Sequence, residues 1–79
     1  MAYPKTESEW AERVARHLKA ELKRADVTYD ELAKRLARFG FEETKASIAN
    51  KLTRATTSAH FLLASLAAIK INILRLEDI

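Results

Sequence analysis

The sequence predicts an all-α domain, a compact bundle of five helices. Its 79 residues include one glycine and one proline, which leaves few points at which a helix would break. Apolar residues recur every three or four positions along most of the chain, the spacing of a buried helix face. A chain of this length forms a single domain with a small core. We therefore expect one domain over residues 1–79, with residues 1–5 disordered.

The first helix is expected to begin at Thr6, where Glu9 three residues later suggests a capping box. Trp10, Val14, Leu18 and Leu22 then follow at a spacing of four and predict one buried stripe.

The second helix has the clearest start signal, because Thr28 and Glu31 fit a capping box and Val27 and Leu32 fit a hydrophobic staple. It should end near Gly40, since glycine is the usual residue at a helix end. The aromatic rings on either side of that glycine, Phe39 and Phe41, are predicted to pack the turn into the core.

Three further helices complete the prediction. The third, around residues 44–54, has Thr44 as its N-cap and buries Ala46, Ile48, Ala49 and Leu52. The fourth, over residues 59–69, follows Thr56-Thr57-Ser58 and is apolar nearly all round, which predicts burial or a shared interface. The fifth is a short helix over residues 72–79, although the alternation of Ile71 and Ile73 also permits a strand.

Helices two and three resemble a known motif. The segment LKRADVTYDELAKRL, residues 22–36, is similar to the start of the repressor/Cro-type (lambda-repressor-like) helix-turn-helix family. Ile48 matches the buried isoleucine of that family's recognition helix, although the turn is longer and Tyr29 and Ala55 replace the usual glutamine and glycine. The pattern from Trp10 to the Phe61 helix also resembles an uncharacterised family of short bacterial proteins of unknown function.

The resemblance implies sequence-selective binding of double-stranded DNA by a transcriptional regulator. We expect the protein to be cytoplasmic, because the sequence has neither a membrane-spanning run nor a signal-like start. The third helix would enter the major groove and the second would cross the backbone. Asn50 would pair with adenine, while Lys51 and Arg54 would contact guanine or phosphate. The expected DNA-binding residues are Tyr29, Lys34, Thr44, Lys45, Ser47, Asn50, Lys51 and Arg54.

The distribution of charge favours the same function. Net charge is only +3, but the segment from Thr44 to Leu76 contains no acidic residue and five lysines or arginines. A segment of one sign creates a local positive field even when the total charge is small.

Catalysis, metal binding and membrane insertion have little support. The chain has no cysteine, no glycine-rich phosphate loop, and no motif that joins serine, histidine and an acid, so we expect no enzyme. The two histidines, His17 and His60, are not in a metal-ligand spacing, and we expect no cofactor and no small-molecule substrate. The longest apolar run, Phe61 to Ile69, is too short to span a bilayer.

The alternative function is a protein-interaction module that keeps the fold without binding DNA. Large apolar residues crowd the end of the chain, and excess apolar surface often marks an interface. The simplest partner is a second copy, because a homodimer would also present two recognition helices to DNA. The expected dimer interface contains Ile71, Ile73, Leu74, Leu76 and Ile79, with residues 59–69 beside it.

Overall fold

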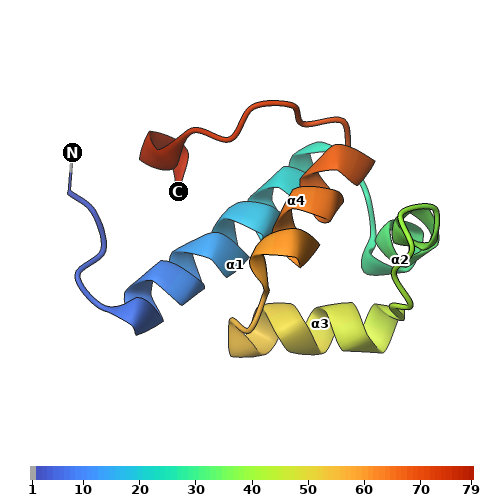
Figure 1. The fold of residues 1–79 in the computed structure, drawn as a ribbon, viewed down its shortest axis with the longest axis horizontal. Coiled ribbons are helices and arrows are strands. Elements are labelled where there is room, and N and C mark those ends of the chain that lie inside the picture. Colours follow the sequence, from blue (N-terminus) through green and yellow to red (C-terminus); the bar gives the residue numbers. More distant parts are fainter. Residues whose placement is uncertain (1) are drawn as a thin grey trace.

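A computed structural model describes residues 2–79 and confirms the all-α class (Figure 1). The helices are α1 (Glu7–Arg24), α2 (Tyr29–Ala37), α3 (Lys45–Arg54) and α4 (Ala59–Ala68), and a 3-10 turn, η1, covers Leu76–Asp78. Residues 2–79 contain no β-strand.

Each α-helix begins at a hydroxyl residue whose side chain accepts a hydrogen bond from the backbone N–H three residues later. These N-caps are Thr6, Thr28, Thr44 and Ser58. The predicted caps are therefore confirmed, but the predicted capping boxes of α1 and α2 are only half formed. At α1 the Glu9 carboxylate accepts from the Lys5 N–H at 3.0 Å and does not return to Thr6. At α2 the Glu31 carboxylate accepts from Arg35 instead of from the Thr28 N–H.

The core lies where the four helices meet. Figure 1 shows α1 and α4 side by side, with α3 running across one end of the pair and α2 next to the start of α3. The residues that fill the core come from every α-helix and from the α1–α2 turn: Ala15, Leu18, Leu22, Val27, Leu32, Leu36, Ile48, Leu52, Phe61, Leu62, Leu66 and Ile69. Both residues of the predicted staple, Val27 and Leu32, are buried.

The turn between α2 and α3 corrects one prediction. The chain leaves α2 after Ala37 and turns at Gly40, whose φ of +87° suits glycine. Phe41 packs against the core, but Phe39 is 53% exposed, so only one of the two rings packs inward. Phe39 still belongs to the hydrogen-bonded turn that follows α2, whereas Phe41 lies beyond the reversal at Gly40. Ala46 of α3 is also exposed, contrary to the prediction.

The predicted fifth helix is wrong over most of its length, because η1 is the one helical turn within residues 72–79. Lys70 has a φ of +64°, which ends α4 and starts an irregular segment. Ile71 and Leu74 pack against the core, and this anchoring holds the segment extended along the bundle. The tail then returns over α1, where the Arg13 guanidinium donates to the carbonyl oxygen of Ile79 at 3.1 Å (Figure 1).

The N-terminal segment contacts the first helix. Tyr3 stacks on Trp10 with ring centroids 6.0 Å apart, and Pro4 is buried. Met1 lies outside the described residues, and the expected disorder of residues 1–5 stays a prediction.

Candidate nucleic-acid interface

The start of α3 is fixed by a complete capping box. The Ser47 N–H donates to the Thr44 hydroxyl at 3.0 Å, and the Thr44 N–H donates to the Ser47 hydroxyl at 2.8 Å. The first turn of α3 therefore has satisfied backbone donors and a defined direction.

A buried carboxylate ties the preceding turn to α3. Glu43 has a side chain that is 8% exposed, forms an ion pair with Lys51 and accepts a hydrogen bond from the Ser47 hydroxyl at 2.6 Å. The Lys51 ammonium also lies 5.0 Å from the centre of the Phe61 ring, within range of a cation–π interaction. These contacts connect the turn, α3 and α4 at one point.

The same contacts set the ionisation of Glu43. Burial alone would raise the pKa of the Glu43 carboxyl, but hydrogen bonds from Lys51 and Ser47 and the charge of Lys51 together hold that pKa below its ordinary value. Glu43 is therefore ionised at neutral pH, and its negative charge compensates the positive charge of Lys51.

The outer face of α3 carries the remaining polar groups. Thr44, Lys45, Asn50 and Arg54 are exposed, and the helix itself contains no acidic residue. Inside, Ile48 and Leu52 are fully buried and hold the helix on the core. The exposed surface of α3 therefore presents one amide and two cations without a neutralising carboxylate on the same helix.

The two site residues expected on α2 lie in different surroundings. Tyr29 is half-buried and packs against the core, while Lys34 is exposed and pairs with Asp30 at 3.6 Å. An exposed pair of this length contributes little to stability, so Lys34 can exchange Asp30 for another anion.

Sequence reasoning placed Ser47 and Lys51 on the polar face but missed their contacts with Glu43. A signal was present, because Glu43, Ser47 and Lys51 recur at intervals of four. Two of the eight expected DNA-binding side chains, Ser47 and Lys51, are thus held by Glu43.

The residues of the expected dimer interface are divided between core and surface. Ile71 and Leu74 pack against the core, and Ile79 is half-buried at the end of the tail. Ile73 and Leu76 are 75% and 57% exposed. Exposed apolar area is therefore concentrated on two of the five side chains.

Residues 2–79 hold neither a cluster of metal ligands nor a membrane-spanning helix. Among them, no three histidine or acidic side chains come together as ligands for a metal ion. None of the helices that they form has the length and apolar character needed to cross a membrane.

Residues 10–74, from the first turn of α1 to the middle of the tail, match a family described as Domain of unknown function (DUF6471). The chain belongs to this family. The expected membership of a family of unknown function is confirmed, and the match is to this family rather than to the repressor/Cro-type one. No curated protein and no solved structure matches the chain.

Proposed function

We propose that this member of the DUF6471 family binds double-stranded DNA as a helix-turn-helix regulator, with α3 in the major groove and α2 across the backbone. The observation that carries the proposal is the division of α3 into two faces. Ile48 and Leu52 are buried on one face, and Asn50 and Arg54 are exposed on the opposite face. Lys45 is exposed at the first turn, and the helix contains no acid.

The exposed groups suit distinct parts of a duplex. The Asn50 amide offers the donor and acceptor that an adenine edge requires in the major groove. Lys45 and Arg54 lie at opposite ends of α3, and each supplies a cation for phosphate or guanine. Thr44 has its hydroxyl oxygen in the capping box and its side chain at the exposed start of the helix.

The residues expected on either side of α3 take supporting roles in this proposal. Lys34 holds register by contacting phosphate, and Tyr29 at the start of α2 is a second contact to the DNA backbone. Ser47 and Lys51 contact the Glu43 carboxylate and so fix the orientation of α3. In this proposal they affect DNA binding by orienting the helix.

A homodimer is part of the same proposal. Ile73 and Leu76 are exposed on the tail, on the side of α1 where Arg13 holds Ile79. Burial of large apolar side chains against a second copy would remove their contact with water. The same exposure supports the alternative function, a protein-interaction module that uses the tail and leaves α3 solvated.

Binding to a mixed-sequence duplex as a function of salt tests the proposal. The variant Lys45→Ala/Arg54→Ala removes two cations from α3, and Arg16→Ala/Lys70→Ala removes two exposed cations from other parts of the surface. We expect the slope of log affinity against log salt to become shallower by about 1.8 for the α3 variant, at roughly 0.9 per lost phosphate contact. We expect a smaller change for the matched control.

Two results would contradict DNA binding. The first is no measurable binding by folded wild-type protein at low salt. The second is an equal loss of slope in the α3 variant and in the control, which would indicate a general attraction between charges rather than a contact by α3.

A further inference from the structure

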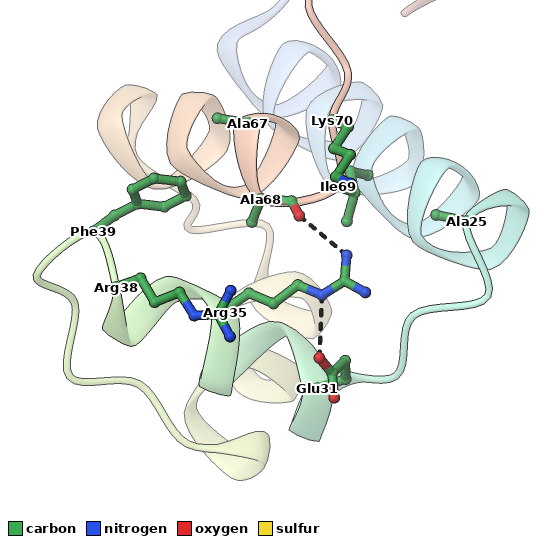
Figure 2. Close-up of a pocket in the computed structure, with 9 residues that line it drawn as sticks. All are labelled: Ala25, Glu31, Arg35, Arg38, Phe39, Ala67, Ala68, Ile69 and Lys70. Atoms are coloured by element: carbon green, nitrogen blue, oxygen red, sulfur yellow. Dashed lines mark hydrogen bonds and ion pairs between the residues drawn. The ribbon is translucent and has the colours of Figure 1, made fainter.

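A hollow lies away from α3, between α2 with its following turn and the C-terminal end of α4. It has a volume of about 590 Å³, and Figure 2 shows the side chains of α2 and the end of α4 that face each other across it. No residue of α3 lines it. Whatever this hollow binds, the exposed face of α3 remains free.

Arg35 neutralises the groups that would make this hollow acidic. Its Nε donates to the Glu31 carboxylate at 3.1 Å, and its Nη1 donates to the carbonyl oxygen of Ala68 at 3.1 Å (Figure 2). Ala68 is the last residue of α4, where backbone carbonyls lack helical partners and carry partial negative charge. The negative charge of Glu31 and the partial negative charge at the end of α4 are therefore already compensated by Arg35.

Two further cations on the rim are in surplus. Arg38 follows α2 and Lys70 follows α4, and both side chains are exposed. Neither is paired with a carboxylate within residues 2–79. The hollow thus combines one held guanidinium with two cations that are available to an incoming anion.

The wall beside these cations is apolar. Phe39 and Ala67 line the hollow, and Leu63 lies one turn before Ala67 on α4. Phe39 is 53% exposed and Leu63 is 59% exposed. α4 has no charged residue, so Leu63 and Ala67 continue the apolar surface away from the cations.

We propose that this hollow docks an acidic segment of a partner protein that also carries a large apolar side chain. Carboxylates of that segment would pair with Arg38 and Lys70, and its apolar side chain would cover Phe39 and Leu63. The occupant follows from charge complementarity, because surplus cations beside exposed apolar groups match a segment with both properties. The apolar wall of Phe39 and Leu63 makes the hollow a poor match for a phosphate backbone, which has no apolar side chain to cover it.

The inference does not depend on DNA binding by α3. The probe is a displayed library of short random peptides, selected against the full chain and followed by titration of a selected synthetic peptide. We expect selected sequences to combine aspartate or glutamate with an aromatic or aliphatic residue. Addition of the peptide should shift the amide resonances of Phe39, Ala67 and Lys70 in NMR spectra.

Two variants separate the charged and apolar contributions. Arg38→Glu/Lys70→Glu should weaken peptide binding by at least about tenfold, because like charges then face each other. Lys5→Glu/Arg16→Glu makes the same change of charge on exposed residues elsewhere and should leave affinity within about twofold. Phe39→Ser/Leu63→Ser should weaken peptide binding, because it removes the apolar wall. It should leave DNA binding unchanged, because it keeps the net charge.

Several results would overturn the inference. One is a library that yields no binder, or binders without acidic residues. Another is equal loss of affinity in the Arg38/Lys70 and Lys5/Arg16 variants. A third is self-association of the wild-type chain that Phe39→Ser/Leu63→Ser abolishes, because the occupant would then be a second copy. Each result is independent of whether the duplex experiment succeeds.

Discussion

Glu43 shows how a single side chain orients the proposed recognition helix. Its carboxylate lies at the positive end of α3 and contacts both Ser47 and Lys51. Because Lys51 also lies over Phe61, the pair connects α3 with α4. The sequence around α3 suggested six DNA contacts, Thr44, Lys45, Ser47, Asn50, Lys51 and Arg54, but three-dimensional neighbours decide which of them are available.

Replacing Glu43 with glutamine should lower the free energy of unfolding at neutral pH by about 1–2 kcal/mol, because Lys51 loses a charged partner. The folded pKa of Glu43 lies below its ordinary value of 4.5, so this contribution is present above that pH. It is lost as pH falls through the folded pKa. Urea denaturation of wild type and variant should therefore differ at pH 7 and converge in acid.

Glu42→Gln is the matched control, since Glu42 is exposed and adjacent to Glu43. It should leave stability unchanged within about 0.5 kcal/mol. A difference between wild type and Glu43→Gln that persists unchanged into acid would contradict the assigned role of the carboxylate.

Ser65 is a second residue whose environment the sequence does not reveal. It is fully buried in α4, and its hydroxyl oxygen has no hydrogen-bond partner among residues 2–79. Ser65→Ala should therefore raise the free energy of unfolding by about 0.5–1 kcal/mol, because an unpaired buried hydroxyl is removed. Thermal unfolding measures this effect. Ser8→Ala, at an exposed position, is the control for the change of residue type. A destabilised Ser65→Ala variant would contradict the assignment.

Helix starts are the elements that the sequence predicts best. Each depends on a local pattern, a hydroxyl residue whose side chain accepts a hydrogen bond from the backbone N–H three residues later. All four caps form this bond: Thr6, Thr28, Thr44 and Ser58. The tail was predicted poorly because its conformation depends on distant contacts. Ile71 and Leu74 find places in the core that local spacing cannot indicate.

The end of α3 provides a test of backbone strain. Ala55 caps the helix with a φ of +54°, a left-handed conformation that disfavours any residue with a Cβ atom. Ala55→Gly should raise the free energy of unfolding by about 0.5–1 kcal/mol. The same substitution inside α3, Ala49→Gly, should lower it by about 1 kcal/mol. Urea denaturation giving the same sign for both would contradict this account.

Dimerisation through the tail is a property of the whole molecule that sedimentation can test. Within the proposed function, Ile73 and Leu76 contact a second copy, so wild type should sediment as a dimer. Ile73→Ser/Leu76→Ser should shift the equilibrium to monomer without unfolding, because both side chains are exposed. Ile71→Ser is the contrasting variant, since Ile71 packs against the core and its loss should lower stability. A wild-type monomer at high concentration would contradict dimerisation through the tail.

The arrangement of the whole molecule leaves one face of α3 free and places the other on the core. The periodicity of residues 44–54 predicted both faces from sequence, with the exception of Ala46. What the sequence could not supply was the hollow beside Arg35, because it joins α2 to the end of α4 through contacts between residues far apart in the chain. Local patterns thus predicted the proposed DNA surface, whereas the second surface required the fold.

Whether α3 binds DNA is tested most directly by titrating the isotopically labelled chain with a duplex. The amide chemical shifts are recorded at each step of the titration. If α3 is the recognition helix, the largest shifts fall on residues 44–54 and on the start of α2, and Asn50→Ala reduces them without unfolding the protein. Shifts concentrated on α1 and the tail, or no shifts at low salt, would contradict the assignment of α3 as the recognition helix.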